Sequence, residues 1–570
     1  MNKKIYLIQL LLISIAYSQV RNADFKIHDR GNLWETMKDN GTIGAPNPTN
    51  RFEYYPSMDW PGGPNLMNKD DQRSYSVGSG MWIGGKRLDG SVFFTENGPF
   101  NFVDNGTFET IIKEENFLGS SSYNAAEAEQ IITAKWKTTE NISVQRKSRV
   151  WSFPLLNNFV ICEYIIKNES AAAVNDVYVG FPNLTRPSYQ DFVVHNGWGD
   201  DFNRTDELVG YDSTRKLIYI WDDTPNFSLP TDIGNFWESA GELRTTGYAG
   251  VAVLFADPAS DGRPQPSNVF WAQLLNNEKF FTIQSSNSQN LYNILSGSDR
   301  TLQANAGDHL TPFILLSAGP YNLAPNSSVK IVTVEAVNGI SIENALKGLS
   351  SQALLPEGLD SLKNTIDRAA NLFQNNYQVS AVPPPSPQIE IYALPSNKTI
   401  ALAWKPIESD WINPISGKSN FREYKIYRSD RSFIGPFTMI RRIDPKRSTD
   451  VTRYYDSQNN LSVYEDQTIS LGAGYFYAVT SVDSAGNESW LTNRNESAIT
   501  ATRSPSPNAL NVKVFPNPFK EVSGFPTAGT ENYIVFSNLP AECKIRIYTS
   551  SGELLRVLEH NNPNSGEEVW

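Results

Sequence analysis

The sequence predicts a mainly β protein: a large antiparallel β-sandwich region ending in a short helical pair, then two smaller sandwich modules, the last incomplete. Three observations carry this prediction. Short runs of alternating apolar and polar residues recur between turn-forming Gly, Asn, Asp and Pro. Helical periodicity is confined to about 341–376, and two proline-rich breaks divide the chain. A chain of 570 residues is also too long for a single core.

Strands are predicted where β-prone residues alternate between turn signals. In the large region such runs fall at 81–88, 91–94, 150–153, 159–167, 177–181, 216–221, 250–255 and 328–337. Asp89-Gly90 separates the first two runs. An Asp-Gly pair favours a tight hairpin in which both residues have positive φ. We therefore expect one large antiparallel sandwich or two stacked ones.

Two helices are predicted at the end of this region. The first carries Ile342, Ala345, Leu346 and Leu349 at helical spacing, and Pro356 breaks the pattern. The second gathers its apolar residues on one side: Leu359, Leu362, Ile366, Ala369, Ala370 and Phe373. We expect the pair to pack on the sheet and to close the region.

The proline runs 382–387 and 503–507 set the domain boundaries. Proline fixes φ and removes a backbone donor, so such runs stay extended between folded units. The predicted units are residues 19–381, 388–503 and 508–570.

Residues 1–18 have the composition of a signal peptide. Lys3 and Lys4 precede an apolar run at 5–16, and Ala16-Tyr17-Ser18 fits the small-x-small cleavage pattern. The run is too short to span a bilayer, and no later segment is apolar enough. We expect a protein outside the cytoplasm, extracellular or on the outer cell surface, that is not an integral membrane protein.

Composition excludes several partners and chemistries. The formal net charge of -12 argues against a nucleic-acid partner, which needs a basic face. Only Cys162 and Cys543 are present, in different predicted units, so a disulfide framework is not expected. Cys162 should share a buried strand face with Val160, Tyr164 and Ile166.

Residues 388–503 have the alternation of an immunoglobulin-like sandwich, with Trp404 on an early strand. The segments 423–429 (EYKIYRS) and 475–489 (YFYAVTSVDSAGNES) resemble two strands of bacterial fibronectin type III modules. That resemblance implies a spacer or binding module. It also implies that 483–488 is an ordinary turn, although its oxygens could be taken for a metal loop.

The last unit resembles the C-terminal sorting modules of type IX (Por) secretion cargo and the immunoglobulin-like domains of flagellar hook-capping proteins. The segments 514–519 (VFPNPF), 534–540 (IVFSNLP) and 544–549 (KIRIYT) carry the resemblance. It implies contact with secretion machinery. Such modules continue for two or three more strands, so we expect an incomplete sandwich with an open sheet edge, which favours aggregation or pairing with another chain.

The strongest candidate binding site is a polar stretch at 195–207. Four alternate residues could direct oxygen atoms at one hard cation such as calcium: Asp201, Asn203, Thr205 and Glu207. The stretch lacks the central glycine and distal glutamate of an EF-hand. A solvated acidic loop is the simpler interpretation, and acid/base catalysis is a third.

No catalytic residue, cofactor site or metal cofactor beyond calcium is predicted. The four histidines lie at no metal-ligand spacing, and neither GxSxG nor a P-loop is present. Exposed tryptophans could make a sugar-binding face, although most should be core; among them are Trp60, Trp82, Trp198, Trp221 and Trp237. The favoured function is a secreted interaction or structural protein that binds glycans or other surface proteins.

The alternative is an extracellular carbohydrate-active or other hydrolytic enzyme with accessory modules. A glycosidase needs only two suitably spaced carboxylates. The best candidates for that role are Asp200, Asp201, Asp222 and Asp223.

Overall fold

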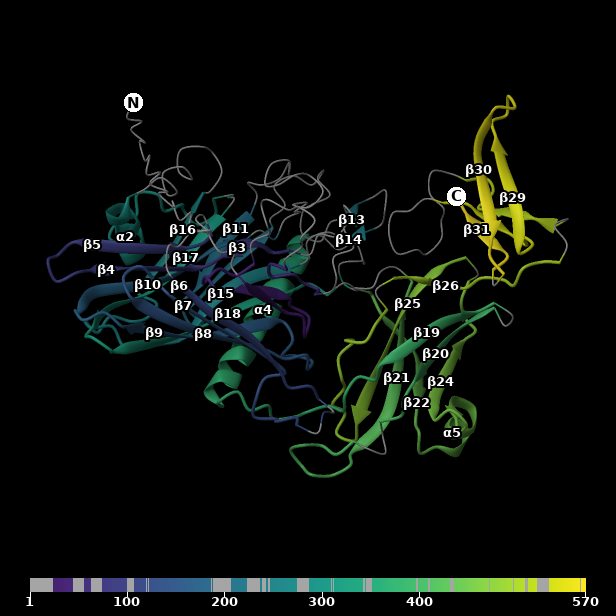
Figure 1. The fold of residues 1–570 in the computed structure, drawn as a ribbon, viewed down its shortest axis with the longest axis horizontal. Helices are drawn as coiled ribbons and strands as arrows, with labels where there is room; N and C mark the ends of the chain where they lie inside the picture. Colours follow the sequence, from purple (N-terminus) through teal and green to yellow (C-terminus); the bar gives the residue numbers. More distant parts are fainter. Residues whose placement is uncertain are drawn as a thin grey trace, which may run out of the picture.

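The structure is a computed structural model, and it describes most of the chain. The described residues are 24–44, 56–62, 74–99, 107–118, 120, 122–185, 187, 207–222, 236–237, 242–243, 247–273, 287–308, 310, 312–341, 344, 351–395, 398–407, 411–430, 435–470, 472–495, 497–507, 511–519, 533–563 and 565–570. The predicted signal peptide at 1–18 lies outside them. Within these ranges the chain is mainly β, as predicted, with antiparallel sheets throughout (Figure 1).

One layer of the large region is a six-stranded sheet in the order β16-β17-β10-β4-β5, with β3 also paired to β10. Its strands are β3 (Ser76–Ser79), β4 (Met81–Lys86), β5 (Val92–Asn97), β10 (Val174–Thr185), β16 (Asn268–Gln273) and β17 (Pro312–Leu323). Helix α2 (Ser288–Ser296), which the sequence did not predict, packs its buried face on this layer.

The second layer is an eight-stranded sheet in the order β11-β12-β15-β18-β9-β8-β7-β6. Its strands are β6 (Thr107–Glu115), β7 (Gln130–Lys137), β8 (Ile142–Val150), β9 (Phe159–Asn168), β11 (Glu207–Asp212), β12 (Leu217–Asp222), β15 (Gly247–Ala256) and β18 (Ser328–Gly339). Two short pairs accompany the layers: β1 (Phe25–His28) with β2 (Glu35–Lys38), and β13 (Phe236–Trp237) with β14 (Glu242–Leu243).

Apolar side chains from the two layers meet in a shared core, so the region is one large sandwich. Ile132, Ala134 and Trp136 of β7 face Ile83 and Val179 of the six-stranded sheet within one buried cluster. Cys162 lies on this inner face together with Val160, Tyr164 and Ile166, as predicted, and burial raises the pKa of its thiol to about 12. Cys162 is therefore a core residue.

Helix α4 (Ser351–Gln374) covers part of the outer face of the eight-stranded sheet. Leu362, Ile366 and Ala369 are buried there, as the predicted stripe requires. Pro356 does not separate two helices: α4 begins five residues before it and includes it. Pro356 lies beyond the first four residues, whose N–H groups have no partner inside the helix, so it costs α4 one backbone hydrogen bond without ending it. Most of the predicted first helix lies outside the described residues.

Two local predictions for the large region need correction. At the β4–β5 hairpin only Gly90 has positive φ, +83°, while Asp89 accepts hydrogen bonds from the Ser91 N–H and hydroxyl. The loop is therefore longer than a two-residue turn. The predicted strand at 150–153 is also wrong, because β8 ends at Val150 and the chain turns at 153–156.

Residues 389–500 fold into two four-stranded antiparallel sheets, β19-β20-β24-β23 and β22-β21-β25-β26. The elements are β19 (Ile389–Leu394), β20 (Thr399–Trp404), β21 (Phe421–Ser429), β22 (Thr438–Ile443), α5 (Ser448–Tyr454), β23 (Tyr455–Asp456), β24 (Leu461–Asp466), β25 (Gly474–Asp483) and β26 (Ile499–Thr500). The predicted alternating residues are buried between the sheets: Ile400, Leu402, Trp404, Tyr424, Ile426, Tyr475, Tyr477 and Val479.

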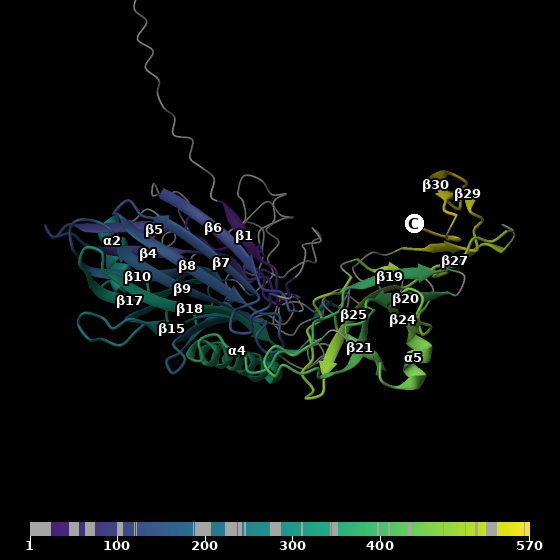
Figure 2. The ribbon, with the colours of Figure 1, turned by 60° about the horizontal axis from the view of Figure 1, so that its bottom comes forward.

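The first proline run packs against folded structure on both sides. Val382 is fully buried, and its carbonyl oxygen accepts a hydrogen bond from Asn413 Nδ2 at 3.1 Å. Arg494 Nη2 reaches across to the carbonyl oxygen of Gly62 at 2.8 Å. A single apolar cluster runs from Trp151 and α4 through Val382 into the 389–500 unit. Figures 1 and 2 show the two units side by side.

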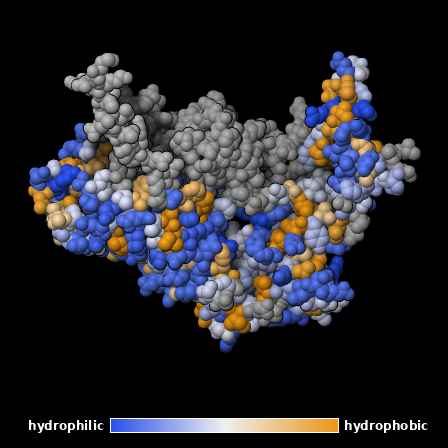
Figure 3. Space-filling view, in the orientation of Figure 1, coloured by the Kyte–Doolittle hydropathy of each residue, from blue (hydrophilic) through white to orange (hydrophobic). Residues whose placement is uncertain are grey.

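The last unit contains two small sheets. One joins β27 (Lys513–Phe515), β28 (Val535–Ser537) and β31 (Glu567–Val569), and the other is the hairpin of β29 (Glu542–Tyr548) and β30 (Leu554–Asn561). Several large side chains of the hairpin are exposed: Tyr548, Leu554, Leu555 and Val557. An orange, hydrophobic stripe runs along this unit at the upper right of Figure 3. None of the described helices is both long and apolar enough to cross a membrane.

Candidate functional site

Of the predicted calcium ligands, only Glu207 lies among the described residues; Asp201, Asn203 and Thr205 do not. Glu207 opens β11, is buried, and exchanges two backbone hydrogen bonds with Leu310, at 3.1 and 2.9 Å. In the described part of the chain no group of three or more His, Cys, Asp and Glu side chains is placed to hold a metal ion. The calcium site remains a prediction.

The structure describes the side chains of three of the tryptophans named for the predicted platform: Trp60, Trp82 and Trp221. Trp60 and Trp82 are buried in the sandwich. Trp221 stacks between Tyr219 and Tyr248, with ring centroids 5.5 and 5.8 Å apart, in the cluster that packs under α4. Trp198 and the side chain of Trp237 lie outside the described residues, as do Asp200 and Asp223, whereas Asp222 ends β12.

A group of carboxylates lies inside the sandwich. Glu335 on β18 accepts hydrogen bonds from Ser79 Oγ at 3.0 Å and Asn183 Nδ2 at 3.4 Å. Burial and the charge of Glu335 raise the pKa of Glu35 well above its usual value, and burial raises the pKa of Glu335 as well. Both side chains are too deeply buried to meet a substrate in this conformation.

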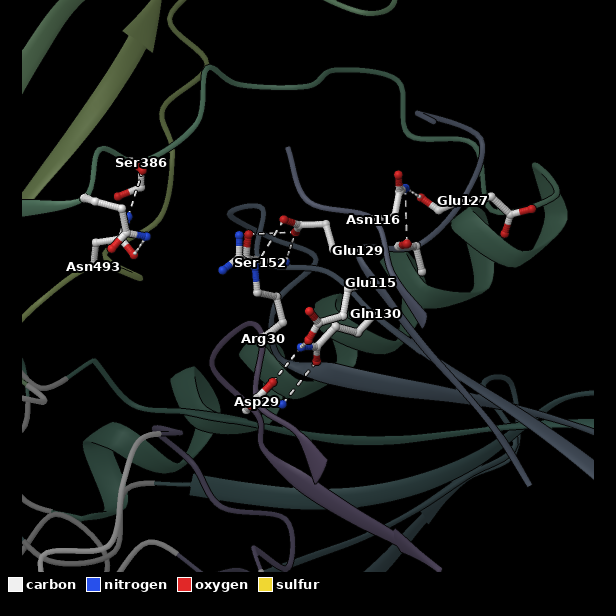
Figure 4. Close-up of polar contacts among 12 residues, drawn as sticks. Asp29, Arg30, Glu115, Asn116, Glu127, Glu129, Gln130, Ser152, Ser386 and Asn493 are labelled. Carbon is white, nitrogen blue, oxygen red and sulfur yellow. Dashed lines mark hydrogen bonds and ion pairs between the residues drawn. The ribbon is translucent and has the colours of Figure 1, made fainter. Parts of the chain in front are cut away.

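A second polar cluster lies where β1, β6 and β7 meet the end of β8 (Figure 4). Glu129 is buried, and its Oε2 accepts hydrogen bonds from the Ser152 backbone N–H at 2.5 Å and hydroxyl at 2.7 Å. Its other oxygen accepts from Arg30 Nε at 3.4 Å, and that guanidinium lies over the Phe117 ring. These contacts fasten the loop before β7 to the end of β8.

The exposed half of this cluster is also saturated. Asp29 Oδ1 accepts hydrogen bonds from Gln130 Nε2 at 2.5 Å and Lys113 Nζ at 2.7 Å. Burial alone would raise the pKa of Asp29, but these two donors lower it, so the carboxyl stays ionised. Burial lowers the pKa of neighbouring His28 to about 3, so the imidazole is neutral. Neither group has the pKa of a general acid near neutral pH.

The remaining candidate is the outer face of β7, β8 and β9, on the side of the sheet opposite the core. Cross-strand pairing defines its rows: Thr133 opposite Lys147 opposite Glu163, then Lys135 opposite Gln145 opposite Ile165, then Lys137 opposite Ser143 opposite Lys167. Figure 2 shows these strands side by side, with α4 lying beyond β18 and β15. We call the set Thr133, Lys135, Lys137, Ser143, Gln145, Lys147, Ile165 and Lys167 the lysine face.

Positive charge exceeds negative charge on the lysine face, although Glu163 borders it opposite Lys147 and pairs with Lys330 and Arg149. Glu169 binds both Lys137, at 2.7 Å, and Lys167, at 3.9 Å. Glu169 and more weakly Glu109 raise the pKa of Lys137. Across the described residues no carboxylate forms an ion pair with Lys135 or Lys147, and Lys135 is exposed. This excess stands out in a chain of net charge -12.

This face was not predicted from the sequence, although the alternation along its strands was visible there. Apolar residues alternate with Thr133, Lys135 and Lys137 along β7, and with Ser143, Gln145 and Lys147 along β8. This period of two indicates strands with one solvated face. Which strand lies beside which, and so which lysines adjoin, is not contained in either run alone.

No protein-family model matches the chain, and no curated protein matches it. Among solved structures it is similar to a polysaccharide lyase at 9% identity and a TM-score of 0.24, over 82% of this chain and 45% of that one. A putative aldose 1-epimerase from Escherichia coli K12 aligns at 10% identity and a TM-score of 0.25, over 56% of this chain and 100% of that one. The chain thus spans less than half of the lyase, and at these TM-scores neither likeness carries an argument about function.

Proposed function

We propose that this protein is an extracellular, non-catalytic binding protein and that the lysine face of its sandwich is the binding surface, with glycans as its partners. The observation that carries the proposal is the lysine face of β7, β8 and β9, a solvated part of the sheet that lies beside the part covered by α4. Flat polar surfaces of this kind suit extended ligands better than small molecules, which prefer concave apolar pockets.

The alternative, an extracellular carbohydrate-active enzyme, has weaker support. Acid/base hydrolysis of a glycoside needs an accessible carboxyl group whose pKa is raised. Among the described residues a raised carboxyl pKa is found at Glu35, Glu335 and Glu567. The first two lie inside the sandwich, and Glu567, with a pKa of about 6, lies in the small last unit.

Export and modular organisation are further parts of this proposal. Residues 1–18 would be removed on export, and the 388–503 unit would act as a fibronectin type III spacer. The two four-stranded sheets of that unit support the second point. The last unit would contact secretion machinery. Sequencing the secreted protein from its N-terminus should give Gln19 first, whereas a retained Met1 would contradict removal of a signal peptide.

Lysine acetylation footprinting of the full-length protein tests the binding surface. The probes are immobilised neutral and acidic polysaccharides, and the rate of modification is compared with and without each probe. Protection should concentrate on Lys135 and Lys147, while exposed Lys26 and Lys405 serve as internal controls. If no probe protects the lysine face, the proposed surface is wrong. Release of new reducing ends from a bound polysaccharide would instead favour the enzyme.

A further inference from the structure

We infer that the lysine face recognises an acidic polysaccharide, a polymer that carries both anionic groups and hydroxyls. This inference rests on the proposed function, because it names the ligand class of the same surface. Its basis is the arrangement of ammonium groups and neutral polar groups across three adjacent strands.

Lys135 and Lys147 carry charge that no ion pair in the described residues neutralises. The register places Lys135 and Lys147 as diagonal neighbours on β7 and β8, because Thr133 pairs with Lys147 and Lys135 with Gln145. Diagonal neighbours on one sheet face have Cβ atoms about 7–8 Å apart. Like charges this close repel each other. Glu163 lies opposite Lys147 on β9, but its carboxylate forms its ion pairs with Lys330 and Arg149. An anionic ligand that bridges both lysines would remove the repulsion.

The spacing of the lysines indicates an extended ligand. Lys135 and Lys137 are two residues apart on β7, which separates them by about 7 Å along the strand. Lys137 and Lys167 are separated by one strand, with Ser143 between them, or about 10 Å across the sheet. The four lysines of the face are therefore spread over a greater distance than one anionic group can span. This spacing fits a polymer with repeated charges.

Neutral polar side chains lie between the lysines. Thr133, Ser143 and Gln145 occupy the positions between the ammonium groups and offer hydroxyl and amide groups that both donate and accept hydrogen bonds. Sugar hydroxyls need such partners, whereas a bare polyanion does not. The face offers no aromatic ring for base stacking, the feature that single-stranded nucleic acids use.

The charge also explains how an acidic protein could hold an acidic polymer. The rest of the chain repels a polyanion, and salt screens this repulsion over about 10 Å at 0.1 M. The lysine face must therefore act at short range, through direct contact between ammonium and carboxylate or sulfate. Binding should be orientation-specific and should weaken as ionic strength rises.

The test compares three polymers on the full-length protein: polygalacturonate, dextran sulfate and neutral dextran. We expect polygalacturonate or dextran sulfate, but not dextran, to bind with an affinity that falls with added salt. The two acidic probes distinguish a carboxylate from a sulfate as the anionic group. Double-stranded DNA at equal phosphate concentration is a fourth arm and should bind at least about tenfold more weakly.

The variant K135E/K147E should lower the affinity for the acidic polymer by about tenfold or more at low salt. The control K26E/K405E changes net charge equally at two exposed lysines that are not part of the lysine face and should retain most of the affinity. Circular dichroism and thermal melting of both variants confirm that they fold.

The outcomes separate this inference from the proposed function. Footprint protection of the lysine face by neutral dextran, without salt dependence, would preserve the proposed binding surface and overturn the acidic-polymer inference. Equal losses of affinity in K135E/K147E and K26E/K405E, or equal binding of DNA, would mean that the polymer is held by general charge attraction. Either result would overturn the acidic-polymer inference. Absence of any protected lysine on the face with every polymer would overturn the proposed function itself.

Discussion

Arg146 shows at the scale of one residue how the sandwich holds charge in its core. Its guanidinium is fully buried and donates hydrogen bonds to the backbone carbonyl oxygens of Lys38 at 2.8 Å and Gly41 at 3.2 Å. It also lies over the Trp136 ring, and its charge lowers the pKa of Glu335 against the effect of burial. A buried charge without such partners is strongly unfavourable.

The raised pKa of Glu335 predicts a pH dependence of stability. The folded protein keeps this proton at pH values where the unfolded chain, with a pKa near 4.5, has released it. The contribution of Glu335 to the free energy of unfolding is therefore fully present below the unfolded pKa. It is lost as the pH rises through the folded pKa. Glu335→Gln keeps an acceptor for Ser79 and should flatten this fall. Urea unfolding from about pH 5 to about 8 measures it.

Glu163 on the outer face is the matched control. Burial favours its neutral form, but hydrogen bonding to Lys330 and the charge of Arg149 lower its pKa overall. Its contribution to stability is present above the unfolded pKa and is lost as the pH falls through the folded one. Glu163→Gln should therefore reduce a loss of stability that occurs as the pH falls below 4.5, and urea unfolding of this variant is followed down to about pH 3. Identical pH profiles for both variants would contradict the assignment.

At the scale of elements, the apolar stripe of α4 was predictable from the sequence, whereas its packing against the sheet decides where the helix begins. The predicted stripe is correct at Leu362, Ile366 and Ala369, and Phe373 packs on Phe255 with ring centroids 6.1 Å apart. The start of the helix was predicted wrongly, because α4 continues through Pro356, where the proline removes one backbone hydrogen bond but does not end the helix. The outer face of the sheet supplies the apolar surface that stabilises this amphipathic helix.

Ile366→Ala tests the packing of α4 on the sheet. Ile366 is only 1% exposed, so removing its side chain leaves a cavity, and we expect a loss of about 2–4 kcal/mol in the free energy of unfolding. Asn364→Ala, at an exposed position of the same helix, should change stability by about 0.5 kcal/mol or less. Urea denaturation of both variants is the measurement. A loss for Ile366→Ala no larger than for the control would mean that α4 does not pack as described.

The β4–β5 hairpin offers a second test at this scale. Gly90 has a φ of +83°, and an added Cβ would meet nothing within 4 Å, so conformation alone opposes a side chain. Gly90→Ala should therefore lower stability by about 1 kcal/mol. Gly90→Asn should lose less, because asparagine tolerates the left-handed region better. Equal losses from the two substitutions, measured by thermal melting, would point to a cause other than φ.

At the scale of the whole molecule, the proline run 382–387 joins two folded units instead of holding them apart. Val382 is buried in the cluster that links Trp151 and Leu372 to Trp411 and Phe421. Asn493 Nδ2 donates to the carbonyl oxygens of Ser386 at 2.7 Å and Pro387 at 2.9 Å. The lysine face therefore belongs to a body that is continuous with the 389–500 unit.

This continuity predicts cooperative unfolding. Calorimetry of the full-length protein should show one transition for the large sandwich and the 389–500 unit together. Val382→Asp buries an unpaired charge at the junction and should split this transition in two. Tyr455→Asp, at an exposed site in the second unit, should leave a single transition. Two well-separated transitions in the unsubstituted protein would refute the coupling.

The sequence by itself determined the mainly β class, several of the strands, such as β4, β9 and β18, the buried face around Cys162 and the apolar stripe of α4. These features depend on neighbours a few residues apart, and the periods of 2 and 3.6 residues record them directly. Only the tertiary structure decided that Glu35 and Glu335 share one core, that the proline run is buried, and that Lys135 and Lys147 adjoin. The first two depend on contacts between segments far apart in the chain, which leave no local period, and the third depends on the register of the β7–β8 hairpin.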